Sequence, residues 1–132
     1  MIAATYTDSI PVPRLWVGRV ISALTALFLF VDGITKALRV APVVEASAQL
    51  GYSAAATLGI GVLLLVCLAI YLVPRTAPLG AILLTGYLGG AVATHVRFGS
   101  PPFSVVFPVI LGALLWLGLF LRDSRLRTLL SV

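Results

Sequence analysis

The 132 residues suffice for one domain, and 61 % of them are hydrophobic while only 10 % are charged. A soluble domain of this size cannot bury so much apolar side chain, because its surface is large relative to its volume, so a soluble globular protein is excluded. The net charge of +5 comes from basic residues that are scattered and not interleaved with aromatic residues, which argues against nucleic acid as a partner. The expected partner is the lipid bilayer.

The first apolar run covers approximately residues 15–38, after a polar segment that contains Pro11 and Pro13. An alternative is a secretory signal peptide cleaved near Ala46-Ser47-Ala48. The run is longer than the usual apolar core of a signal peptide, about 7–15 residues, and Asp32 and Lys36 interrupt its end. The sequence therefore predicts a first membrane-spanning helix, followed by a polar loop over residues 39–53.

Three further apolar runs cover approximately residues 54–73, 79–96 and 103–121. Prolines separate the second run from the third, and the segment 98–102 with Gly99, Pro101 and Pro102 separates the third from the fourth. Each run is close to the ~20 residues that a helix needs to cross ~30 Å of hydrocarbon. The runs do not alternate between apolar and polar residues as barrel strands do. We predict an all-α integral membrane protein, a four-transmembrane-helix bundle that forms a single membrane domain over residues 1–132.

The distribution of basic residues predicts the orientation of the bundle. With the N-terminus inside, six arginines fall on the cytoplasmic side and three basic residues on the opposite side. The two groups are Arg14, Arg19, Arg75, Arg122, Arg125 and Arg127, and Lys36, Arg39 and Arg97. The positive-inside rule then predicts a multi-pass protein of the cell (inner) membrane with both termini cytoplasmic. Trp16, Tyr71 and Trp116 lie toward the ends of spans, where aromatic residues meet the membrane interface.

Polar side chains gather where the first and third spans end, and these ends face the same leaflet because odd-numbered spans run in the same direction. Asp32, Lys36 and Arg39 are spaced i, i+4, i+7 and share one helix face, which Ser22 and Thr25 continue. The first loop and the third span add Glu45, Tyr87, Thr94, His95 and Arg97. Charges at membrane depth are costly and often functional. We predict a polar pocket near the extracytoplasmic leaflet.

The predicted catalytic residues of this pocket are Asp32, His95 and Lys36. Asp32 is the deepest charge, and His95 is the one side chain of the group whose ordinary pKa is near neutrality. The predicted ligand-binding residues are Arg39, Glu45, Tyr87, Thr94 and Arg97. The alternative is a structural role, in which Asp32 and Lys36 form a plain intrahelical ion pair while the arginines reach lipid head groups.

A ridge of small residues, Gly86, Gly90 and Thr94, follows one face of the third span. Such ridges allow helix backbones to approach closely in lipid. The ridge predicts packing within the bundle that brings Asp32 and His95 to opposite sides of one small pocket. A homo-oligomer seam is the alternative use of the same ridge.

Cys67 is the one cysteine and excludes an intramolecular disulfide or a cysteine-based zinc site. A single histidine and the initiator Met1 cannot supply two axial ligands to a haem. We predict neither a metal site nor a covalently bound cofactor.

Several segments carry a family resemblance: Arg19, residues 30–36, residues 50–52 and residues 79–97. Together they resemble the DoxX-like family of small bacterial four-helix integral membrane proteins. The resemblance implies a four-helix membrane bundle. The family's named relatives include a subunit of a thiosulfate–quinone oxidoreductase and partners of oxidative-stress enzymes. More distant relatives use paired cysteines for redox work, and this chain departs from that pattern.

Three functions are compatible with these observations. The first is an accessory or redox-linked, quinone-facing membrane subunit, which needs a lipid quinone as electron carrier and a membrane or redox protein as partner. The second is a stand-alone membrane enzyme that uses acid–base chemistry on a lipophilic small molecule, of the isomerase, epoxide-opening or cyclase type. The third is an assembly or interaction factor.

Overall fold

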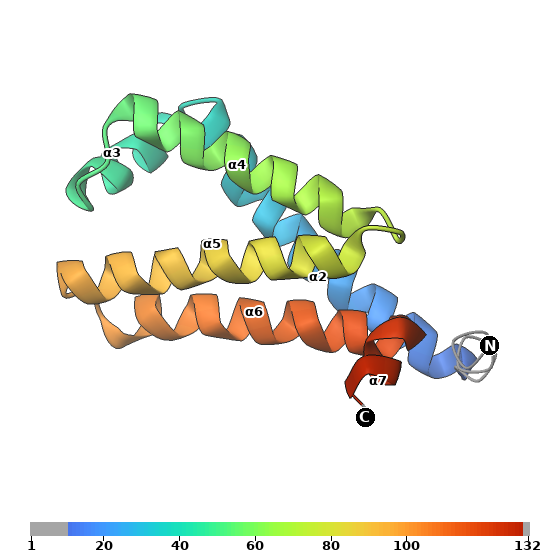
Figure 1. Cartoon of the computed structure of the whole chain (residues 1–132). Helices are drawn as coiled ribbons and strands as arrows, with labels where there is room; N and C mark the ends of the chain where they lie inside the picture. The colour runs from blue at the N-terminus through green and yellow to red at the C-terminus, as the bar shows by residue number, and fades with distance from the viewer. Residues whose placement is uncertain (1–10, 131–132) are drawn as a thin grey trace.

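Four helices, each antiparallel to its two neighbours, form a ring in a computed structural model of the protein, which describes residues 11–130. Figure 1 shows this bundle from the side. The spans are α2 (Val12–Ala37), α4 (Ala54–Leu72), α5 (Ala77–Phe98) and α6 (Pro102–Arg122). α2 and α5 each pack against both α4 and α6, so α2 and α5 lie across the bundle from one another. We call the end where α2 begins and α6 ends the terminal end, and the opposite end the α3 end. The predicted all-α fold and its four spans are confirmed, and each bound lies within three residues of its prediction.

Prolines and one serine set where the spans begin. α2, α5 and α6 each have a proline in their first turn, where its missing N–H has no helical partner in any case. α4 begins instead at Ser53, whose side-chain oxygen accepts a hydrogen bond from the backbone N–H of Ala56 at 3.1 Å. The same prolines that interrupt the apolar runs therefore start the next helix.

Two short helices lie outside the predicted elements: α3 (Ala41–Gln49) in the first connection and α7 (Ser124–Leu130) after α6. The prediction of a loop over residues 39–53 is therefore wrong for nine of its residues. The chain leaves α2 through Arg39, whose φ of 57° is rare for a residue with a side chain. Helices this short are marginal in isolation and depend on packing, which explains why the sequence alone did not reveal them.

The outer surface of the ring is apolar. Only 22–33 % of the most apolar part of each span is buried inside the bundle, and large side chains such as Leu24, Leu27, Ile82 and Val109 face outward. The shortest span has 19 residues and is about 28 Å long at 1.5 Å per residue, close to the ~30 Å of the hydrocarbon core. The chain is therefore a membrane protein with four spans.

Leucines fill the centre of the ring, and single glycines bring the helices together around it. The fully buried leucines are Leu29, Leu64, Leu68, Leu84, Leu115 and Leu119. A Cβ on Gly80 of α5 would lie 2.3 Å from the backbone of Tyr71 in α4, and a Cβ on Gly118 of α6 would lie 2.3 Å from Oγ of Ser22 in α2. These helices touch only because a side chain is missing at each position.

The predicted packing ridge does not serve this purpose. A Cβ on Gly86, Gly89 or Gly90 would have no atom within 4 Å to contact. The prediction that this ridge packs closely against another helix of the bundle is therefore wrong, because the closely packed glycines are others.

A polar network joins three helices at the terminal end. Nε of Arg122 donates to Oγ of Ser22 at 3.0 Å, and Oγ of Ser22 lies 3.1 Å from the hydroxyl of Tyr71. The Tyr71 hydroxyl donates to the carbonyl of Leu115 at 2.9 Å, so its single hydrogen is used and Ser22 must donate to Tyr71. The three bonds run in one direction, which strengthens each of them. Tyr71 lies one residue from the end of α4, and its ring is completely buried among the helices and does not face the lipid.

A second polar contact fixes α7 to the turn between α4 and α5. Nη2 of Arg125 lies 2.8 Å from Oδ2 of Asp123 and also donates to the carbonyl of Pro74 at 2.6 Å. Burial by itself raises the pKa of the Asp123 carboxyl. The hydrogen bonds and charge of Arg125 outweigh that effect and hold the pKa below its ordinary value.

This lowered pKa predicts how the contribution of Asp123 to the free energy of unfolding depends on pH. A carboxyl whose pKa is lower in the folded protein stabilises the fold above its unfolded-state pKa, about 3.9, and the contribution is lost as pH falls through the folded-state value. We expect the thermal unfolding temperature in detergent to fall more on acidification from about pH 5 to about pH 3 in the wild type than in Asp123→Asn. Glu45→Gln, which changes an exposed carboxylate, should leave the wild-type profile intact. Identical profiles for Asp123→Asn and the wild type would contradict the prediction.

Candidate functional site

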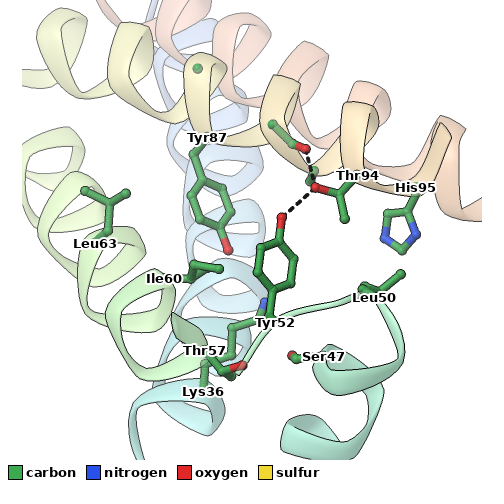
Figure 2. Close-up of a pocket in the computed structure, with 13 residues that line it drawn as sticks. Lys36, Ser47, Leu50, Tyr52, Thr57, Ile60, Leu63, Tyr87, Thr94 and His95 are labelled. Atoms are coloured by element: carbon green, nitrogen blue, oxygen red, sulfur yellow. Dashed lines mark hydrogen bonds between the residues drawn. The ribbon is translucent and has the colours of Figure 1, made fainter. Parts of the chain in front are cut away.

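A cavity of about 300 Å³ lies between α4 and α5 at the α3 end (Figure 2). The two helices touch where Gly80 meets Tyr71 and diverge from there toward α3 (Figure 1). The wall consists of Lys36 from α2, Ser47, Leu50 and Tyr52 from α3 and the residues that follow it, Thr57, Ile60 and Leu63 from α4, and Gly86, Tyr87, Gly90, Ala91, Thr94 and His95 from α5. This volume is at the lower end of the range for small-molecule sites, about 300–1,000 Å³.

The segment 50–52 closes the α3 end of the cavity. α3 ends at Gln49, and the φ of 97° at Gly51, two residues later, lets the chain reverse so that Tyr52 enters the cavity. The Tyr52 hydroxyl lies 2.7 Å from Oγ1 of Thr94, and because Thr94 donates to the carbonyl of Gly90, Tyr52 is the donor of this bond. Nη2 of Arg97 also donates to the carbonyl of Leu50 at 3.3 Å. Both bonds hold the segment against α5.

His95 is positioned by the end of α5. Gly99 takes a left-handed conformation with φ 81°, and the backbone N–H of Ser100 returns to the carbonyl of His95 at 3.0 Å. This turn places Oγ of Ser100 2.9 Å from Nδ1 of His95. Nε2 of the half-buried ring has no protein partner among residues 11–130.

Lys36 brings the ion pair of α2 to the cavity. Its Nζ lies 2.7 Å from Oδ2 of Asp32, and only 19 % of the Lys36 side chain is exposed, against 37 % for Asp32. Lys36 lines the cavity, whereas Asp32 does not. The prediction that Asp32 and His95 line one pocket is therefore wrong, because Asp32 lies behind Lys36 as its hydrogen-bond partner and only His95 is on the cavity wall.

Several polar groups on the cavity wall lack a protein partner within the described part of the chain. They are the hydroxyls of Ser47 and Tyr87 and Nε2 of His95. Lys36 uses one of its three N–H groups on Asp32. Lys36 and the two hydroxyls can donate hydrogen bonds, and Nε2 of His95 donates in the tautomer in which Nδ1 accepts from Ser100. No carboxylate lines the cavity. The cavity thus combines apolar walls with free donors and suits a lipophilic molecule whose head group accepts hydrogen bonds.

The remaining predicted site residues lie away from this cavity. Arg39 and Glu45 are exposed and do not line it, and Arg97 is exposed and reaches it only through the carbonyl of Leu50. Sequence reasoning did not assign Ser47 or Tyr52 to the site. The glycine before Tyr52 is a signal for a helix end, but it has that meaning only once α3 is recognised as a helix.

Comparison with known proteins agrees with the fold. A family model described as the DoxX-like family matches residues 20–118, which include every residue that lines the cavity. No curated protein and no solved structure matches the chain. Within residues 11–130, no three side chains of the metal-binding kinds come close enough together to hold a metal ion.

Proposed function

Because the chain belongs to the DoxX-like family of membrane proteins, we propose that it is an accessory, redox-linked membrane subunit that holds a lipid quinone in the cavity between α4 and α5. The observation that carries the proposal is the set of unpaired donors in a cavity with apolar walls. A donor without a partner is costly at membrane depth, so these groups favour a ligand with acceptor oxygens.

The residues present fit a quinone head group. A quinone ring is apolar on both faces and carries two carbonyl oxygens that accept hydrogen bonds. Ile60 and Leu63 would contact the ring, while Lys36 and Tyr87 would donate to a carbonyl oxygen. When bound, the quinone supplies electron and proton transfer, which this chain's own side chains do not provide.

The edge of the cavity beside Gly86 and Gly90 suits the tail of such a molecule. Both glycines are exposed, and a Cβ on either would contact nothing, so no side chain closes the space beside them. Leu63 on α4 is 54 % exposed at the opposite edge. A lipophilic tail could therefore leave the cavity between α4 and α5 into the bilayer.

We also propose that the bundle lies in the cell (inner) membrane with both termini cytoplasmic. The support is the charge of its two ends. Six arginines belong to the terminal end, and three basic residues, Lys36, Arg39 and Arg97, belong to the α3 end. The cavity would then face the extracytoplasmic leaflet.

A stand-alone enzyme acting on a lipophilic small molecule is the second candidate. Lys36, Tyr87 and His95 are titratable groups on the wall of one cavity, as acid–base catalysis requires. Conversion of a lipophilic substrate by the purified chain without a redox partner would favour the enzyme. Stoichiometric purification with a redox protein would favour the subunit.

Filling the cavity tests the proposal. We expect Gly90→Leu to weaken the binding of decylubiquinone to the purified protein in lipid nanodiscs at least about tenfold, because the new side chain fills the edge of the cavity through which the tail would leave. Gly89→Leu is the matched control, since Gly89 is also exposed and unopposed but does not line the cavity. Neither change should alter thermal stability by more than about 1 kcal/mol. Equal affinity of the two variants would place the quinone elsewhere.

A further inference from the structure

Lys36 is the one charged lysine or arginine side chain on the wall of the cavity. Its Nζ is held at 2.7 Å by a carboxylate that is itself outside the cavity. Figure 2 shows Lys36 and Tyr87 on the wall of this cavity, with Tyr87 reaching down from α5 and Lys36 rising from α2 behind Tyr52. The Tyr87 hydroxyl has no hydrogen-bond partner in the described part of the chain.

Asp32 is close to both of these groups. Its carboxylate accepts the Lys36 hydrogen bond and also interacts electrostatically with Tyr87. This hydrogen bond fixes the Nζ group of Lys36 and therefore the direction of its two remaining N–H donors.

We propose that Asp32 is a positioning residue, which acts through Lys36 so that Lys36 and Tyr87 together donate to a single oxygen atom of the head group. This inference rests on the proposed function and specifies its ligand class: lipophilic molecules that carry a carbonyl or phenolate oxygen. Molecules without an acceptor leave two desolvated donors unpaired and bind weakly. Cationic lipophiles are repelled by the ammonium group of Lys36.

Two probes with the same tail test the preference of the cavity for ligands that carry an acceptor oxygen. Decylubiquinone carries carbonyl acceptors, and decylbenzene carries none. We expect the wild-type protein in lipid nanodiscs to bind decylubiquinone at least about tenfold more tightly than decylbenzene, the range of a hydrogen bond from a charged donor. Lys36→Met and Tyr87→Phe should each bring the two affinities closer together, mainly by weakening decylubiquinone.

Variants of Asp32 distinguish a role in positioning Lys36 from a general structural role. Asp32→Asn should reduce the selectivity between the two probes about as much as Lys36→Met does. Asp32→Glu, which keeps a carboxylate four residues before Lys36, should restore it. Glu45→Gln is the control, because it removes an exposed carboxylate at the same end of the bundle that does not line the cavity. If Asp32→Asn does not fold, the double variant Asp32→Asn with Lys36→Gln leaves no unpaired charge and should show the same low selectivity.

The outcomes separate this inference from the proposed function. A wild type that prefers decylubiquinone, together with an Asp32→Asn variant of unchanged selectivity, would overturn the role of Asp32 and leave the quinone site standing. An equal loss of affinity for both probes in Asp32→Asn would show that the cavity has collapsed. This result would also overturn the positioning role. A wild type that binds neither probe would overturn both proposals.

Discussion

Replacing Gly80 by alanine should lower the free energy of unfolding by about 1–3 kcal/mol, the usual cost of overpacking a tightly packed interior. The new Cβ would lie 2.3 Å from both Cα and N of Tyr71. These are backbone atoms, so no side-chain rotation can relieve the clash. α4 and α5 would have to separate next to the short turn that connects them, and separation there also disturbs Tyr71 and its hydrogen bonds.

Gly86→Ala is the matched control for this prediction. Gly86 lies in the same helix, and its Cβ would contact nothing within 4 Å. Both variants gain the same helix propensity, up to about 1 kcal/mol, so the difference between them isolates the close contact. Reversible unfolding in detergent micelles, followed by circular dichroism, gives both values. Equal stability of the two variants would show that α4 and α5 do not approach as closely as the structure places them.

Replacing Tyr71 by phenylalanine should cost about 1–2 kcal/mol of stability, toward the upper end of hydrogen-bond contributions in membrane proteins. The change removes one hydroxyl but leaves the buried Ser22 hydroxyl without its acceptor and the Leu115 carbonyl without this donor. Arg122, which stacks over the Tyr71 ring at 5.2 Å, keeps that contact in the variant.

Tyr52→Phe provides the comparison, since it also removes a tyrosine hydroxyl that bonds to a neighbouring helix. Tyr52 is only half-buried, and Thr94 keeps its own bond to the carbonyl of Gly90. We therefore expect a smaller loss of stability from Tyr52→Phe under the same conditions. A larger loss than that of Tyr71→Phe would refute the view that the directed network at the terminal end stabilises the bundle.

The spans could be predicted because hydropathy adds up over about 20 residues and prolines mark the boundaries. Polar contacts between different helices could not be predicted in this way. Asp32 and Lys36 are neighbours along one helix, so their pairing is a local property that the sequence contains. Tyr71 and Ser22 are 49 residues apart, and nothing near either residue identifies the other.

The prediction of which glycines make close helix contacts was wrong for a related reason. Spacing of four residues shows that Gly86 and Gly90 share a face but not what lies opposite that face, and the structure places a cavity there. Gly80 and Gly118 make the closest helix contacts, although neither shares a helix face with another glycine four residues away. Tyr52 lines the cavity only because the chain reverses at Gly51 after α3, and a nine-residue helix is too short to give a clear periodic signal.

For the ligand proposed above, the unobstructed edge at Gly86 and Gly90 would determine the phase from which it arrives. A molecule that enters between α4 and α5 comes from the hydrocarbon, into which it has already partitioned. The concentration that governs occupancy is then its mole fraction among the lipids and not its concentration in water. Diluting the protein with additional lipid at a fixed amount of ligand would empty the site, whereas diluting the whole sample with buffer would scarcely change its occupancy. Since transfer out of water would be complete before the head group reaches Lys36, apolar burial would add little on entry, and the polar contacts of the cavity would supply the preference for the bound state.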